Sequence, residues 1–148
     1  MAELALNQTV HGRLPVIGEY PDQLSKTGVD RWLLHAEFSL VHAQMRAERG
    51  DVTGTAGQSA KAVIETAHAL ACARHLWVIN EKKLVEQSGL QDVHRRFTDI
   101  PATPPELLTW LDELRAALKQ VCPRGAKYSR VKFRDGKAGK NRHPYLNT

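Results

Sequence analysis

Residues 49–84 read RGDVTGTAGQSAKAVIETAHALACARHLWVINEKKL. Gly50 suits the left-handed backbone that ends a helix, and the Asp51 carboxylate can accept hydrogen bonds from the free amide groups that begin the next one. Alanine is frequent in the rest of the segment, and no proline follows until Pro101. We therefore expect one helix to end near Arg49 and a single long helix to follow it.

A further helix is predicted before this segment, from Pro21 or Asp22 to Arg49, with Gly28 as a place where it can break. Apolar residues recur along it at steps of three and four, which places them on one face: Leu33, Ala36, Leu40, Ala43 and Ala47. The long helix after Asp51 has a similar seam of mostly small residues: Val52, Ala56, Ala60, Val63, Ala67, Leu70 and Arg74. Such seams are typical of antiparallel neighbours in a bundle.

The last predicted helix begins at a capping box formed by Thr103 and Glu106, with Pro104 in its first turn. Its apolar stripe consists of Leu107, Leu111, Leu114, Leu118 and Val121. Two short helices are expected before it, at residues 81–88 and 91–97. Because no segment alternates apolar and polar residues with period two, the sequence predicts an all-α, antiparallel up-and-down helical bundle.

The 148 residues are enough for one ordinary domain. We expect an irregular arm at residues 1–20, the helical bundle at 21–123 and a flexible tail at 124–148. No apolar run is long enough to span a bilayer, and no secretory leader is recognised. Cys72 and Cys122 have no metal-ligand spacing, so we expect two buried, reduced thiols and a cytoplasmic protein.

The excess of positive over negative charge lies in the last residues of the chain. Residues 124–148 contain eight Lys or Arg and the single acid Asp135, so they carry +7, which leaves −2 for residues 1–123 within the net charge of +5. A basic tail of this kind can contact nucleic acid weakly through phosphates, with Tyr128, Phe133 and Tyr145 available to stack on bases. The alternative is a solvated tail without a ligand.

One row of polar residues on the long helix is a candidate ligand site. Lys61, Glu65, His68 and Cys72 are separated by four, three and four residues and share one face, which is predicted to lie roughly opposite the apolar seam. An amine, a carboxylate and an imidazole in one row can bind a polar ligand or move a proton. The competing interpretation is a solvated helix face with an ordinary Lys61 to Glu65 pair.

Three other features carry candidate chemistry. Glu37 lies among apolar residues, where desolvation can raise its pKa and make it a base, although an exposed glutamate fits the pattern equally. His35 and His42 are seven residues apart, which is not a usual metal-ligand spacing, so no metal site is expected. Asn80, Glu81 and Lys82 lie where the long helix is expected to end, and they can form a cap or contribute to a ligand site.

Several segments carry a resemblance to a known family. These are Phe38-Ser39-Leu40, Arg49-Gly50-Asp51-Val52, Gly57, Lys61-Ala62-Val63, His68-Ala69-Leu70 and Trp77-Val78-Ile79-Asn80-Glu81-Lys82. Together they resemble the C-terminal helical, HEPN-like domain of bacterial nucleotidyltransferase-domain proteins, over about Tyr20 to Val121. In that family a separate domain supplies a Gly-Ser motif and metal-binding aspartates, and this sequence has neither. It also lacks the spaced arginine and histidine of ribonuclease HEPN proteins.

The resemblance implies a helical domain that binds a nucleotide, a small polar substrate or a protein partner and does not catalyse transfer by itself. The candidate ligand-binding residues are Lys61, Glu65, His68, Asn80, Glu81 and Lys82. One alternative is a subunit that completes the active site of a separately encoded nucleotidyltransferase, with Glu37 or Glu65 as catalytic base and a Mg-nucleotide as cofactor. Otherwise no cofactor is expected. A second alternative is nucleic-acid binding through the tail, and a homodimer is a further possible assembly.

Overall fold

The computed structural model describes residues 12–13 and 18–123, and within them the secondary structure is helical. In chain order the helices are α2 (Asp22–Ala47), α3 (Val52–Ala73), α4 (Leu84–Gln87), the 3-10 helix η1 (Gln91–Phe97) and α5 (Pro104–Val121). The predicted all-α class is therefore confirmed. The predictions for the basic tail, and most of those for the arm, concern residues outside the described ones.

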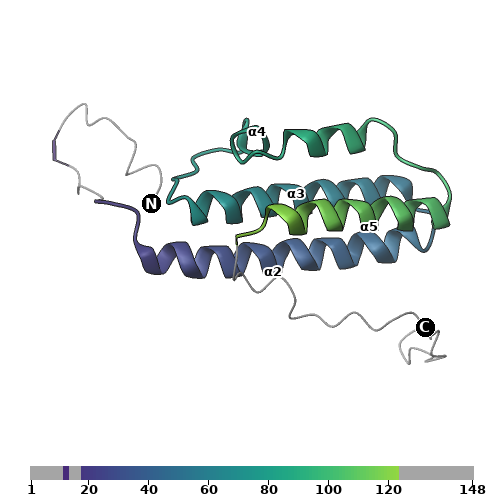
Figure 1. Ribbon diagram of the computed structural model, residues 1–148, viewed down its shortest axis with the longest axis horizontal. Helices are drawn as coiled ribbons and strands as arrows, with labels where there is room; N and C mark the ends of the chain where they lie inside the picture. The colour runs from purple at the N-terminus through teal and green to yellow at the C-terminus, as the bar shows by residue number, and fades with distance from the viewer. Residues whose placement is uncertain (1–11, 14–17, 124–148) are drawn as a thin grey trace, which may run out of the picture.

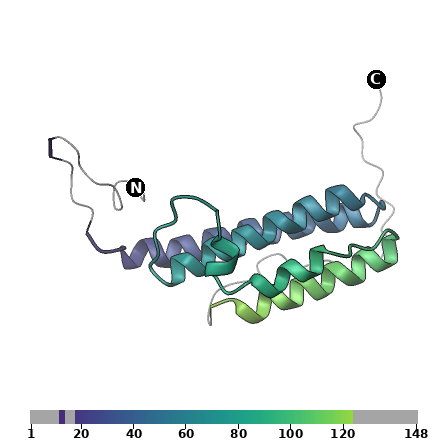
Figure 2. The ribbon, with the colours of Figure 1, turned by 90° about the horizontal axis from the view of Figure 1, so that it is seen from above.

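The helices form two layers. Figure 1 shows α2 and α3 as a long antiparallel hairpin, with the chain returning through α4 and η1 before α5 runs back beside α3. Seen from above in Figure 2, the α2–α3 hairpin makes one layer, and η1 and α5 lie together in the other. The direction of the chain alternates as predicted, but the third position of the bundle is occupied by α4, η1 and the loops around them and not by one long helix.

The turn between α2 and α3 forms as the sequence predicts. Gly50 has a φ of 71°, which is the left-handed conformation that glycine adopts without strain. The Asp51 carboxylate accepts a hydrogen bond from the Gly54 amide at 2.8 Å and also pairs with the Arg46 guanidinium at 2.8 Å. These contacts hold the Asp51 pKa below its usual value. Residue 51 thus caps α3 and ties it to the end of α2.

Helix α3 is shorter than predicted, because it ends at Ala73 and not near Asn80. His75 has a φ of 56°, the His75 amide donates to the Cys72 carbonyl, and the Leu76 amide donates to the Ala71 carbonyl. This pair of bonds is a Schellman motif, which closes a helix through one left-handed residue. Glycine normally marks that position, so a histidine there leaves no signal in the sequence. Lys83 is also left-handed, and α4 begins only after it.

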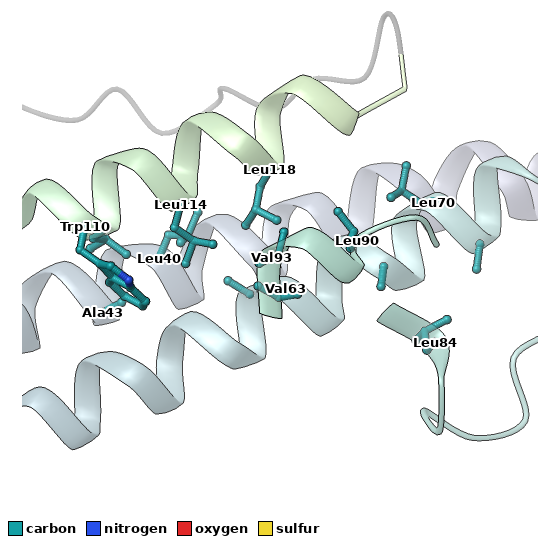
Figure 3. Close-up of a cluster of buried hydrophobic side chains, with 14 residues drawn as sticks. Leu40, Ala43, Val63, Leu70, Leu84, Leu90, Val93, Trp110, Leu114 and Leu118 are labelled. Carbon is teal, nitrogen blue, oxygen red and sulfur yellow. The ribbon is translucent and has the colours of Figure 1, made fainter. Parts of the chain in front are cut away.

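The main core lies between the two layers (Figure 3). The predicted face of α2 is buried along its length, and so are Leu107, Leu111, Leu114 and Leu118 of α5. Val121 is an exception, since it is exposed at the end of α5. At the start of this helix the Thr103 hydroxyl bonds to the Glu106 carboxylate at 2.6 Å and makes no hydrogen bond to the backbone, so the capping box is incomplete.

The predicted seam of α3 is wrong over its first half. Val63, Ala67 and Leu70 are buried as expected, but Thr55 and Ser59 are fully buried while Val52, Ala56 and Ala60 are half-buried. Arg74, the last predicted seam residue, is exposed. Small hydroxyl residues can occupy a helix interface when the backbone satisfies them, and the Thr55 hydroxyl donates to the Asp51 carbonyl at 2.7 Å, whereas the buried Ser59 hydroxyl has no hydrogen-bond partner within the described residues.

Close packing also explains Gly28, which does not break α2. A Cβ atom added at this position would lie 2.8 Å from the Cys72 Sγ atom, so the glycine allows the end of α3 to approach α2. Cys72 and Cys122 are both free thiols and are half-buried beside Val29, Leu33 and Ala69, so they are less buried than the sequence predicted. Burial raises the pKa of Cys122 to about 11.

Replacement of Leu111 by alanine tests the assignment of the core. Leu111 is fully buried between the layers, so the truncation should lower the free energy of unfolding by about 2 to 5 kcal/mol, which chemical denaturation measures. Gln120→Ala on the exposed face of the same helix is the matched control and should change it by less than about 0.5 kcal/mol. Equal losses from the two variants would contradict the packing described for α5.

Candidate functional site

The polar row of α3 lies against α2 and not on the far side of the helix. Glu65 is buried, and the His68 imidazole is stacked on the Trp32 indole with 4.3 Å between the ring centroids. The alternative of a solvated helix face is therefore wrong at Glu65, because both the apolar seam and this side of α3 face other helices. We use the name α2–α3 groove for the surface formed by Trp32, His35 and Ser39 of α2, Lys61, Glu65 and His68 of α3, and Glu81 of the following loop.

Glu65 is the most enclosed charged group of the α2–α3 groove. The Ser39 hydroxyl donates to Glu65 Oε2 at 2.7 Å, across the two helices. The other oxygen, Oε1, is 3.8 Å from Lys61 Nζ and 3.9 Å from His35 Nδ1, both beyond hydrogen-bond distance. The Glu65 side chain is 6% exposed, whereas those of His35 and Lys61 are 48% and 62% exposed. A carboxylate therefore lies beneath two solvent-facing nitrogen groups.

The loop that follows α3 supplies a second carboxylate to the groove. Glu81 Oε1 is 3.0 Å from His68 Nε2, which pairs the imidazole with an acid while Trp32 covers its face. A carboxylate partner of this kind fixes the orientation of an imidazole. The groove thus contains two carboxylates that each lie near a nitrogen group: the enclosed Glu65 near Lys61, and Glu81 near His68 closer to the surface.

Two of the six candidate binding residues stay outside this arrangement. Asn80 does not cap a helix, because its side-chain oxygen accepts from the Lys82 amide at 3.0 Å within the loop, and Lys83 occupies the position before α4. The Lys82 side chain is exposed and lines no described cavity of the groove. The structure therefore brings together Lys61, Glu65, His68 and Glu81, but not Asn80 and Lys82.

Two cavities have Trp32 in their walls. One has a volume of about 420 Å³ and is lined by Trp32, Lys61, Glu65 and Glu81 together with Gly57, Ala60 and Ile64. The other, of about 460 Å³, lies toward Tyr20, Arg31, His35 and Cys72. Both volumes fall within the range of small-molecule sites. The first cavity combines an aromatic wall, a buried carboxylate and an exposed amine, so it can accept a flat polar molecule that carries an anionic group.

Tyr20 closes the end of the hairpin beside the second cavity. The Tyr20 hydroxyl donates to the Cys72 Sγ atom at 3.4 Å, and its ring packs against His75 and Trp77. Burial and the neighbouring thiol raise the Tyr20 pKa, so the phenol stays protonated and acts as a donor. This contact anchors the chain before α2 to the end of α3.

Glu37 is buried, which agrees with the interpretation of a desolvated glutamate and not with that of an exposed one. It lies outside the α2–α3 groove. Burial raises the Glu37 pKa, whereas the positive charges of Lys119 and Arg115 on α5 act in the opposite direction. Glu65 contacts the α3-facing side of α2, and Glu37 is near α5. The two candidate bases therefore belong to different places in the fold.

Sequence reasoning missed Trp32 and Ser39 as groove residues. They are seven residues apart and so lie on one side of α2, but only the pairing of α2 with α3 places them opposite His68 and Glu65. His35 also reaches the groove, while His42 borders another cavity with Met45 and Arg49. Across residues 12–13 and 18–123, no group of three or more His, Cys, Asp or Glu side chains is placed to hold a metal ion.

No family model, curated protein or solved structure matches this chain. Among the described helices, none is both long and apolar enough to cross a membrane. The resemblance to HEPN-like domains of nucleotidyltransferase proteins therefore stays a prediction.

The raised pKa of Glu37 gives a pH-dependent prediction. When the pKa of an acid is higher in the folded protein than in the unfolded chain, ionisation of that acid destabilises the folded protein. The protein therefore becomes less stable as pH rises above the unfolded pKa of about 4.3. The melting temperature of Glu37→Gln relative to the wild type should therefore increase between pH 4 and pH 7. Scanning calorimetry at both values measures the difference. Glu48→Gln, exposed at the end of α2, is the control and should show no such trend.

Proposed function

We propose that the protein is a helical binding domain whose α2–α3 groove takes a nucleotide or a similar small polar ligand, and that it does not transfer nucleotidyl groups by itself. The observation that carries the proposal is the position of the Glu65 carboxylate in the wall of the cavity beside Trp32 and Lys61. The binding takes place in the cytoplasm, where the free thiols of Cys72 and Cys122 stay reduced.

The geometry of Glu65 supports a ligand with N–H donors. A buried carboxylate is costly unless its oxygens accept hydrogen bonds, and Ser39 supplies one to Oε2. The nitrogen groups of His35 and Lys61 are too distant to hydrogen-bond Oε1 in this arrangement. An amino group on a nucleobase would fit this chemistry, because it can donate to Oε1 while the ring lies along the Trp32 indole.

Lys61 supports the anionic part of the ligand. Its ammonium group is largely exposed at the mouth of the cavity, where it can move toward a phosphate and leave Glu65 to the base. Arg31 lines the other cavity that has Trp32 in its wall, and it adds a second positive charge near the groove. The proposed ligand is therefore oriented with its base toward Glu65 and its phosphates toward solvent.

The His68–Glu81 pair favours a second candidate function. An imidazole oriented by a carboxylate is a common general acid or base, so the groove can complete the active site of a separately encoded nucleotidyltransferase. In that assembly Glu65 or His68 accepts the proton of the acceptor, and the partner holds the Mg-nucleotide. Nucleic-acid binding through the basic tail is a third proposal, and it concerns residues outside the described part of the chain.

Ligand titrations of the whole chain test the first proposal. Calorimetry with ATP, GTP and the corresponding nucleosides, each with and without Mg²⁺, should detect saturable binding of at least one nucleotide. Because Glu65→Gln loses a charge-assisted hydrogen bond, it should weaken binding of that nucleotide by about tenfold or more. Lys61→Ala should weaken the nucleotide more than its nucleoside, since only the nucleotide carries phosphate.

Lys26→Ala is the matched control, because Lys26 is an exposed lysine of α2 that lines neither cavity of the groove. It should leave binding unchanged. Absence of binding to all four ligands at millimolar concentration would contradict the first proposal. Binding that survives both Glu65→Gln and Lys61→Ala would place the site elsewhere. Transfer of AMP from Mg-ATP by the purified chain would show that it is a catalyst by itself.

A further inference from the structure

A cavity lies beside the turn that joins α2 to α3, at the end of the hairpin opposite the start of α2 (Figure 1). It has a volume of about 420 Å³, which is within the range of small-molecule sites. Its walls are formed by His42, Met45, Arg46 and Arg49 from the end of α2 and the turn after it, and by Gln58 from α3. We call it the turn cavity. None of the described residues that line it is an acid.

Arg46 is held at the turn cavity by contacts of its own. Its Nη1 atom donates to Asp51 Oδ2 at 2.8 Å. A Cβ atom added to Gly54 would lie 2.8 Å from Arg46 Cδ, so the arginine side chain packs directly on the first turn of α3. A guanidinium group has five N–H donors, and the bond from Nη1 to Asp51 uses one of them. The group is therefore fixed in position while most of its donors stay available to a ligand.

Arg49 is the positive charge of the turn cavity that has no counter-ion. Within the described residues its exposed side chain makes no ion pair and no side-chain hydrogen bond. The neighbouring acid Glu48 accepts a hydrogen bond from Gln44 at 3.2 Å and does not line the cavity. Because Asp51 offsets the charge of Arg46, one uncompensated positive charge remains at the turn cavity.

His42 and Gln58 add uncharged donors from the two helices. Neither side chain has a hydrogen-bond partner within the part of the chain that the structure describes. The amide of Gln58 carries two N–H donors, and a neutral imidazole carries one. Together with the two guanidinium groups, these side chains supply more donors than the two oxygens of a carboxylate can accept. A phosphate group presents three strong acceptor oxygens in a tetrahedral arrangement, which suits donors that converge from several sides.

We propose that the turn cavity binds a phosphate group, with Arg49 as its main counter-ion and Arg46, His42 and Gln58 as further hydrogen-bond donors. Arginine is suited to this role because its planar fork of donors matches the geometry of two phosphate oxygens. The volume of the cavity exceeds that of a single phosphate group, so inorganic pyrophosphate is a suitable probe. The site is separate from the α2–α3 groove and does not depend on the function proposed for the groove.

The turn cavity nevertheless continues the line of the groove. Gln58 precedes Lys61 by three residues on α3, and His42 follows Ser39 by three residues on α2, so each pair is about 4.5 Å apart along its helix axis. The phosphate can therefore come from two sources. One is a free anion, and the other is the terminal phosphates of a nucleotide whose base lies in the groove.

Calorimetric titration of the full chain with inorganic pyrophosphate at low ionic strength tests the site. We expect saturable binding, which Arg49→Ala weakens by about tenfold or more because charge-assisted hydrogen bonds are lost. Gln58→Leu keeps the approximate size of the side chain and removes its amide, so it should weaken binding by about threefold. The melting temperature of Arg49→Ala without ligand should match that of the wild type, since this side chain is exposed and has no partner within the described residues.

Arg95→Ala is the matched control, because Arg95 is an exposed arginine of η1 that lines none of the described cavities. It should leave the affinity for pyrophosphate unchanged. Absence of pyrophosphate binding at millimolar concentration would overturn the proposal. So would binding that Arg49→Ala leaves unchanged, because the anion would then lie elsewhere, for example on the eight Lys and Arg residues of 124–148.

Nucleotides with different numbers of phosphates distinguish the two sources. If the phosphates belong to a nucleotide in the groove, Arg49→Ala should weaken ATP by about tenfold or more and AMP only slightly, and pyrophosphate should compete with ATP. If the ligand is a free anion, Arg49→Ala should weaken pyrophosphate alone. A chain that binds pyrophosphate through Arg49 but binds no nucleotide would contradict the function proposed for the groove and support the phosphate site.

Discussion

The close contact between α2 and α3 is the constraint on which the rest of the fold depends. Many of the fully buried residues of these two helices are small: Ala36, Ala43 and Ala47 on α2, and Thr55, Ser59, Ala62 and Thr66 on α3. Small side chains let two helix backbones approach closely, and a larger residue at any of these positions would separate them. Gly28 extends the same contact to the Cys72 end of the hairpin. The groove exists because this approach brings Ser39 within hydrogen-bond distance of Glu65.

The sequence predicts those parts of the fold that local chemistry controls. The turn at Gly50 and Asp51 and the apolar face of α5 were predictable because one residue or one periodic stripe determines each of them. The end of α3 was not predictable, since His75 adopts a conformation that sequence rules assign to glycine. The first half of the α3 seam was wrong for a different reason. Periodicity counts hydroxyl residues as polar, but Thr55 satisfies its hydroxyl locally and packs in the core.

The candidate site shows a similar division between local and tertiary information. The spacing of Lys61, Glu65 and His68 correctly places them on one side of α3, because helical geometry is local. It does not show that Trp32 and Ser39 lie across from them, which depends on how two helices pair. The same limit applies to Glu37, whose burial follows from its apolar surroundings but whose separation from Glu65 follows only from the position of α5. The proposed ligand and its HEPN-like relatives rest on chemistry and resemblance.

The segment between α3 and α5 gives the bundle one side that is weaker than the others. Short helices there have few internal backbone hydrogen bonds, so this side can open by local fluctuation at a smaller free energy than global unfolding requires. Glu81 belongs to the same segment, and its contact with His68 breaks whenever the segment detaches from α3. The presence of Glu81 in the groove therefore depends on whether this segment is open or closed. A molecule that holds Glu81 and His68 together would slow amide exchange in α4 and η1, including amides that it does not contact.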